Sequence, residues 1–101
     1  MKAIPCTAEI KKIARRIVWF EPPSAALADP VRFLAYAFAR GTHEDMTVIR
    51  RYVCDDDLIE ALDRAPPGII DKRSWAYWNL IVGRYPPPPP PRRRRAATRF
   101  A

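Results

Sequence analysis

The chain has few of the residues from which catalytic sites are built. It contains one histidine, His43, and two serines, and neither serine lies in a strand–turn–helix nucleophile motif. Its three glycines are far apart, which excludes a glycine-rich phosphate-binding loop. Cys6 and Cys54 lack the close spacing of a zinc or redox pair, so we expect them to be unbridged. The sequence therefore predicts no catalytic residue, no cofactor and no metal site, and a protein that is not an enzyme.

Long apolar runs and alternating apolar–polar runs are also missing. No run reaches the roughly 20 residues that a membrane-spanning helix needs, and the N-terminus has no secretory signal pattern. Without period-2 alternation, the sequence carries no clear strand signal. We expect a cytoplasmic helical protein with no membrane segment.

Acidic residues are absent from the C-terminal part. Residues 1–83 carry twelve Lys/Arg and eleven Asp/Glu, whereas residues 84–101 carry six Arg and no acid. The six prolines Pro86–Pro91 lack backbone N–H groups, so they exclude helix and sheet there. We predict a helical domain over 1–83 and a disordered polyproline/arginine tail over 84–101. The tail either is a solubilising extension or holds the phosphates of DNA or RNA through Arg92, Arg93, Arg94, Arg95 and Arg99.

Capping residues and 3.6-residue apolar spacing predict the fold class: an all-α, small bundle of about five short helices. The core is expected to contain Ile13, Ile17, Phe33, Leu34, Phe38, Ile49, Leu58 and Leu62. The first helix is expected to run from a Thr7 cap to about Phe20, and the second over Val31–Arg40 after an Asp29 cap. The third is expected to begin at a Thr42 cap with Asp45 as its capping-box partner, and the fourth at an Asp55 cap. The fifth is expected over Lys72–Val82 after an Asp71 cap.

Two glycines are predicted to end helices. Gly41 follows the Val31–Arg40 helix, where a left-handed residue commonly provides the C-cap, and Gly83 closes the last helix. A helical part of about 80 residues is near the lower limit for a self-sufficient core, so we include a homodimer among the expected partners.

Three acidic residues in a row, Asp55–Asp57, suggest a metal site or a helix start. Consecutive side chains on a helix point about 100° apart, so three neighbours do not converge on one ion. We therefore interpret them as first-turn acids that complement the helix dipole. His43 lies in a comparable first turn, where a solvated surface residue is a simpler interpretation than a general base.

The Gly41–Thr42 junction also permits a helix-turn-helix interpretation. The following helix would present His43, Thr47, Arg50 and Arg51 to a DNA groove. An ordinary corner between two helices is the alternative. The net charge of only about +1 in residues 1–83 disfavours a DNA-reading surface.

Aromatic residues gather near the end of the helical part. Trp75 and Trp78 are spaced i, i+3 on one helical face, so they either pack in the core or form an exposed anchor for a partner. Trp, Tyr and Arg dominate the residues that carry binding energy in protein interfaces.

An ordered series of motifs between Val18 and Arg84 resembles a family of small helical bacterial proteins of unknown function, encoded beside AbiEii-type nucleotidyltransferase toxins. The matching motifs are Val18-Trp19-Phe20, Asp29, Phe33, Arg40-Gly41-Thr42 with Glu44-Asp45, Arg50-Arg51-Tyr52, Leu58 with Leu62, and Ser74-Trp75 with Trp78. The resemblance implies an antitoxin whose partner is the cognate nucleotidyltransferase toxin. Its partner-binding residues are then expected to be Arg50, Arg51, Tyr52, Arg73, Trp75 and Trp78, with Asp55–Asp57 as a second patch. The alternative is a small helical protein that binds nucleic acid through its Arg-rich tail, either self-standing or regulating its own operon.

Overall fold

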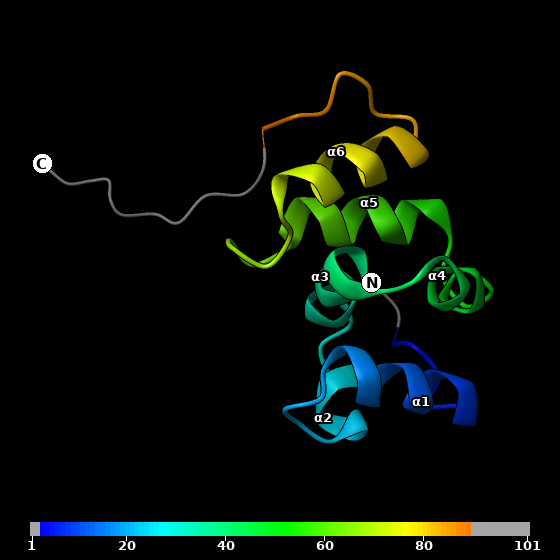
Figure 1. Ribbon diagram of the computed structural model, residues 1–101. Coiled ribbons are helices and arrows are strands. Elements are labelled where there is room, and N and C mark those ends of the chain that lie inside the picture. Colours follow the sequence, from blue (N-terminus) through cyan, green and yellow to red (C-terminus); the bar gives the residue numbers. More distant parts are fainter. Residues whose placement is uncertain (1–2, 90–101) are drawn as a thin grey trace, which may run out of the picture.

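The computed structural model describes residues 3–89, which form six α-helices and no β-strand (Figure 1). This confirms the all-α class. The helices are α1 (Ala8–Ile17), α2 (Pro23–Leu27), α3 (Pro30–Arg40), α4 (His43–Ile49), α5 (Asp55–Arg64) and α6 (Lys72–Ile81). None of the helices in this range is long and apolar enough to cross a membrane.

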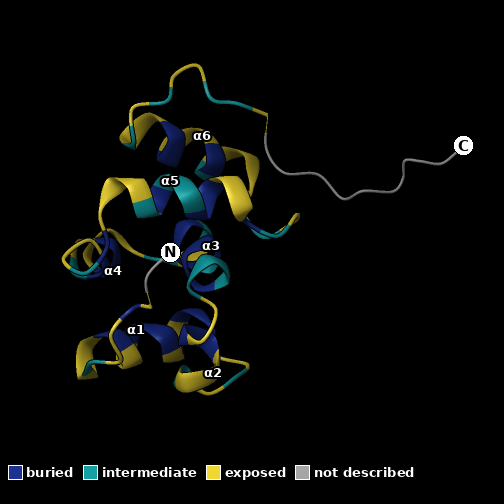
Figure 2. Ribbon diagram, turned by 180° about the vertical axis from the view of Figure 1, so that it is seen from behind, coloured by how far each residue is buried: buried dark blue, intermediate teal, exposed yellow. Residues whose placement is uncertain are grey.

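Helix α3 lies at the centre of the molecule. It packs against α1 and α2 on one side and against α5 and α6 on the other, while α4 packs on α1 (Figure 1). The buried faces of the helices turn toward this central helix, and the exposed faces form the outer surface (Figure 2). All eight side chains predicted for the core are buried, and Leu34, Leu58 and Leu62 are completely covered.

Four predicted helix starts are confirmed by side-chain caps. The side chains of Thr7, Asp29 and Asp71 each accept a hydrogen bond from a backbone N–H in the first turn of the helix that follows. Thr42 and Asp45 form the expected reciprocal capping box, with distances of 3.1 and 3.0 Å. Local sequence therefore determines where these helices begin.

The start of helix α5 was predicted one residue too late. Cys54, not Asp55, is the N-cap of α5. The Asp57 carboxylate reaches back and accepts the Cys54 backbone N–H at 3.1 Å, so the cap is provided from the third helical position. Both cysteines are free and exposed.

The predicted left-handed C-cap at Gly41 is wrong. Gly41 has extended backbone, with φ −70° and ψ 147°. Glycine is needed there for space, because a Cβ would lie 2.6 Å from the Ala37 carbonyl oxygen. Gly83, in contrast, adopts the left-handed conformation predicted for a helix end, with φ +86°.

The segment between α1 and α3 also differs from the prediction. Helix α1 ends at Ile17 rather than near Phe20, and Trp19 and Phe20 lie in a turn. The β-branched and aromatic residues at this end are weak helix formers, and Pro22 restricts the residue before it. The sequence prediction also missed α2, which begins with Pro23 at its first position.

Residues 84–89, which the sequence assigns to the tail, contact the helices. The Arg84 guanidinium bonds Asp63 at 2.7 Å and the Asn79 side chain at 2.9 Å. The Trp75 indole N–H donates to the Pro88 carbonyl at 2.7 Å, so this segment returns over α6 (Figure 1). The rest of the predicted tail, including the five arginines from Arg92 to Arg99, lies outside the described residues.

Candidate functional site: a groove between helices α4 and α6

Helix α4 presents one polar stripe. His43, Thr47 and Arg50 are spaced i, i+4, i+7, so they share one helical face. The Thr42–Asp45 capping box fixes where α4 begins and therefore the phase of this stripe. Met46, on the neighbouring inward side, is 3% exposed and belongs to the core.

Helix α6 presents the facing stripe. Arg73, Tyr77 and Ile81 are spaced four residues apart, and Tyr77 and Ile81 are 51% and 37% exposed. The Asp71 cap sets the phase of α6 as Thr42 does for α4. Trp78 points inward and is 8% exposed. The stripe is therefore an aromatic and aliphatic surface that no other described helix covers.

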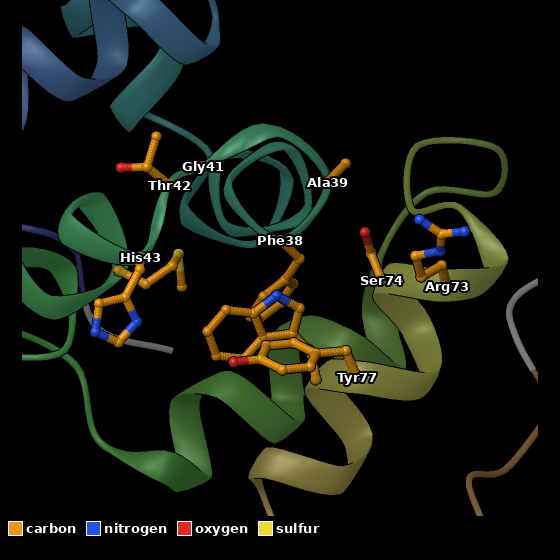
Figure 3. Close-up of a pocket in the computed structure, with 10 residues that line it drawn as sticks. Phe38, Ala39, Gly41, Thr42, His43, Arg73, Ser74 and Tyr77 are labelled. Atoms are coloured by element: carbon orange, nitrogen blue, oxygen red, sulfur yellow. The ribbon is translucent and has the colours of Figure 1, made fainter.

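A groove runs between the two stripes. Two adjoining hollows of about 320 and 110 Å³ share four lining residues, His43, Met46, Tyr77 and Trp78. Phe38 and Tyr77 lie near the centre of the view of the larger hollow, while His43 approaches from α4 and Ser74 and Arg73 lie on the α6 side (Figure 3).

The floor of the groove is a packed aromatic cluster. The Phe38 and Trp78 rings lie 5.2 Å apart, and Tyr77 meets Trp78 edge-to-face at 5.3 Å. Such contacts contribute about 0.5–1.5 kcal/mol each beyond simple burial. Because Phe38 and Trp78 are also core residues, the floor is rigid and already formed before any partner binds.

The rim of the groove is cationic. Among residues 3–89, Arg73 makes no ion pair, and it is exposed. Arg50 pairs with Asp55 at 3.1 Å, but both side chains are largely open to water, so this pair is weak. The groove therefore favours a partner with apolar side chains for its floor and acidic groups for its rim.

An ion pair between exposed Arg16 and buried Asp45 holds α4 on α1. Asp45 is 4% exposed and accepts two hydrogen bonds from Arg16, at 2.6 and 2.5 Å. The Arg16 guanidinium, helped by the Thr42 backbone N–H, holds the pKa of the Asp45 carboxyl below its usual range despite burial. The ionised carboxylate thus fixes one wall of the groove from behind.

Only half of the six predicted partner-binding residues meet at this groove. Arg50, Arg73 and Trp78 line it, although Trp78 is floor rather than exposed anchor. Trp75 is 4% exposed and donates to Pro88 instead, so it is a core residue too. Because both indoles are buried, Trp75 and Trp78 pack in the core, as the first of the two interpretations predicts.

Arg51 and Tyr52 lie at a separate hollow of about 410 Å³. Both contact Glu9 of α1, the arginine at 3.4 Å and the tyrosine hydroxyl at 3.1 Å. Val53, Cys54 and Asp57 complete the lining together with Arg50, which also lines the smaller hollow of the α4–α6 groove. These contacts give Arg51 and Tyr52 a role in joining α1 to the α4–α5 connection.

The acidic run at the start of α5 does not form a metal cluster. No group of three His, Cys, Asp or Glu side chains within residues 3–89 has an arrangement that could hold a metal ion. Asp57 serves the Cys54 cap and Asp55 pairs with Arg50. Asp55 and Asp56 remain exposed, as a small acidic patch beside the groove.

The helix-turn-helix interpretation meets the same groove. The face with which α4 would read DNA carries His43, Thr47 and Arg50, and these residues line the smaller hollow together with Tyr77 and Ile81 of α6. Helix α4 has seven residues. This face is therefore a wall of a groove within the domain rather than a freely projecting recognition helix.

Sequence reasoning missed Tyr77, Ile81 and Met46. The sequence of α6 does contain a pattern that indicates two of them: Arg73, Tyr77 and Ile81 are four residues apart and form a second helical face beside the face of Trp75 and Trp78. Which face is covered depends on packing between helices, and that information is not local. A comparison with protein families, with curated proteins and with solved structures found no match to the chain.

Proposed function

We propose that this protein is an antitoxin-like binding protein that neutralises a nucleotidyltransferase toxin, and that the α4–α6 groove is its principal binding surface. The observation that carries this proposal is the preformed aromatic floor between two helical stripes with an unpaired arginine on the rim. The choice of toxin comes from the sequence resemblance; the choice of surface comes from the geometry.

The groove suits a helix of the partner. Amphipathic helices dock into apolar grooves with anchors spaced i, i+3/i+4 and i+7. Met46, Trp78 and the ring of Tyr77 offer the apolar floor for such anchors. At about 320 Å³, the larger hollow lies at the small end of ligand pockets, which suits inserted side chains better than a drug-sized ligand.

Charge adds direction to this docking. An acidic residue at the edge of the partner helix would pair with Arg73, which has no ion-pair partner of its own within the described residues. The exposed carboxylates of Asp55 and Asp56 lie beyond Arg50 and offer a second contact, to the basic cleft in which such a toxin holds nucleotide or RNA. Inhibition would follow from occlusion or distortion of the toxin's active site.

Co-expression tests the proposal. A nucleotidyltransferase toxin of the AbiEii type is expressed alone and together with this protein, and the proteins are then passed over a size-exclusion column. We expect growth arrest from the toxin alone, protection on co-expression, and co-elution at micromolar concentration. Separate elution without protection contradicts the proposal.

A groove variant locates the contact. The double substitution Arg73→Glu with Tyr77→Ala should restore toxicity, because it reverses the rim charge and removes the exposed ring. Tyr85→Ala is the matched control, since Tyr85 is 77% exposed and lies outside the groove. A stable interface buries roughly 1,200–2,000 Å² in total, and a few such anchors carry most of its energy. Equal protection by the groove variant and the control would place the contact elsewhere.

A further inference from the structure

A second aromatic surface lies at the end of α1. Trp19 is 72% exposed and Phe20 44%, although both follow directly after buried Val18. The two rings meet edge-to-face at 5.5 Å, and Phe20 meets Tyr36 of α3 at 5.6 Å. Three aromatic rings thus form a continuous series on the outside of the molecule, with Trp19 as its most open member.

Two arginines of α3 are stacked into this series. The Arg32 guanidinium lies 5.9 Å from the Phe20 ring and 5.3 Å from the Tyr36 ring, and Arg40 lies 5.0 Å from Tyr36. Arg40 also donates to the Ile17 carbonyl at 3.3 Å. These contacts hold both cations in place against the rings, so the surface is ordered before it binds anything.

The exposed face of α1 extends this surface with positive charge. It carries Lys11, Lys12, Arg15 and Arg16, all exposed. The acid on α1, Glu9, lies at the opposite end of the helix and contacts Arg51 and Tyr52.

The other nearby acids are Asp45, Glu21 and Glu44; the first two are paired, and Glu44 lies close enough to Arg16 to help Asp45 raise the pKa of its guanidinium. Asp45 pairs with Arg16, and Glu21 pairs with Arg32 at 2.6 Å. Within residues 3–89 this leaves four cations of the surface without an ion-pair partner: Lys11, Lys12, Arg15 and Arg40.

We propose that α1, the Trp19–Phe20 turn and the Tyr36–Arg40 face of α3 form a binding surface for single-stranded nucleic acid. Bases stack on open aromatic rings regardless of sequence, and unpaired lysines and arginines hold the phosphates between them. The exposed indole of Trp19 is the stacking platform, and the four unpaired cations follow the backbone.

The shape of the surface favours a nucleic acid over a protein. Anchors of protein partners insert into pockets, whereas none of the three hollows described above includes Trp19, Phe20 or Tyr36. An open, outward-facing ring offers a plane rather than a pocket, which matches a base. A duplex is a poorer fit, because its bases are stacked on each other and must be freed before they can stack on Trp19.

Binding at this surface does not depend on the antitoxin function. Its residues come from α1, α3 and the turn after α1, while the α4–α6 groove draws on other side chains, so each function can fail without the other. The Arg-rich tail is a separate candidate for phosphate contact, and the experiment must separate it from this surface.

Tryptophan fluorescence of the full-length protein is the primary test. Trp75 and Trp78 are buried, so a stacking ligand acts mainly on Trp19 emission. We expect a short oligo(dT) or oligo(U) to quench emission and to bind more tightly than a duplex of equal length. The logarithm of the affinity should fall linearly with the logarithm of the salt concentration, with a slope of about −3 or steeper. This value follows from about 0.7 per phosphate contact on a single strand and one contact for each of the four unpaired cations.

Two variants with matched controls complete the test. Trp19→Ala should remove the quenching and weaken binding about tenfold, measured by fluorescence anisotropy of labelled oligonucleotide, whereas Tyr85→Ala, equally exposed, should change little. Lys11→Glu with Arg15→Glu should weaken binding strongly and reduce the salt slope by about 1.4. Arg64→Glu with Lys72→Glu changes the total charge equally at the other end of the molecule and should have a smaller effect.

Three results would overturn the proposal. Equal losses from the two charge-reversed pairs, with no effect of Trp19→Ala, would assign binding to general charge or to the tail. Equal affinity for single strand and duplex would exclude stacking. A Trp19→Ala variant that binds oligonucleotide normally but loses the toxin would make this surface a protein interface.

Discussion

The α4–α6 groove and the α1–Trp19 surface are built from the same residue types but in opposite shapes. In the groove, Trp78 is 8% exposed and forms a floor beneath Tyr77, so the aromatic group is concave. At the end of α1, Trp19 is 72% exposed and projects outward. Concave aromatic surfaces accept side chains, and open rings accept other rings. One small domain can therefore present two surfaces with different partners.

The largest expected difference between the two surfaces is in stability. Trp78→Ala removes a buried ring that packs on Phe38, and it should lower the free energy of unfolding by about 3–5 kcal/mol. Trp19→Ala removes an exposed ring and should change it by about 0.5 kcal/mol or less. Urea denaturation followed by circular dichroism measures both. Similar midpoints for the two variants would contradict the assignment of one indole to the core and the other to the surface.

The Arg16–Asp45 pair links the two surfaces, because Asp45 supports the groove wall and neutralises a cation of α1. Asp45→Asn should lower the free energy of unfolding by about 2 kcal/mol at neutral pH. Asp56→Asn, at an exposed position on α5, is the control and should have little effect.

The pH dependence of this loss has a definite sign. Arg16 holds the pKa of Asp45 below its unfolded value, so the stabilisation is complete above about pH 5. It is lost as the pH falls below about 4, through the lowered folded pKa. The stability difference between the parent and Asp45→Asn should therefore narrow on acidification. A constant difference from pH 7 to pH 3 would show that the carboxylate charge is not what stabilises the contact.

The smallest expected effect concerns the segment that returns over α6. A chain ending at Tyr85 loses the hydrogen bond from the Trp75 indole N–H to the Pro88 carbonyl, which should cost about 1 kcal/mol. A chain ending at Pro89 keeps this hydrogen bond and should retain the stability of the full-length protein. Thermal unfolding of both truncations measures the difference. Identical melting temperatures would show that the Trp75–Pro88 contact contributes no stability.

Local signals predicted more of the fold than of the site. Caps such as Thr7, Asp29 and Thr42 act over three residues, so the sequence alone locates the helix starts. Gly41 shows the limit, since a glycine required for close approach to Ala37 looks the same in sequence as a left-handed cap. The short helix α2 was missed because proline marks helix ends as well as helix starts, and here Pro23 is the first residue of the helix.

The candidate site depends on contacts that no local pattern encodes. Helical spacing correctly places Trp75 and Trp78 on one face, but only the packing of α3, α5 and α6 shows that this face is buried. The groove exists because α4 and α6 come close together in the fold. Helix α5 separates them in sequence, so no local pattern predicts that they are neighbours. Trp19 was expected in a helix, and its exposure follows from the end of α1 at Ile17.

Site-specific photo-crosslinking tests the proposal that the α4–α6 groove binds a nucleotidyltransferase toxin. A photoreactive phenylalanine analogue replaces Tyr77 in one preparation and Tyr85 in another, and each is irradiated in complex with the nucleotidyltransferase. Both positions are exposed, at 51% and 77%, but only Tyr77 lines the groove. We expect a covalent adduct with the toxin from position 77 and little or none from position 85. An adduct from position 85 alone, or a stable complex with no adduct from position 77, would contradict the proposal.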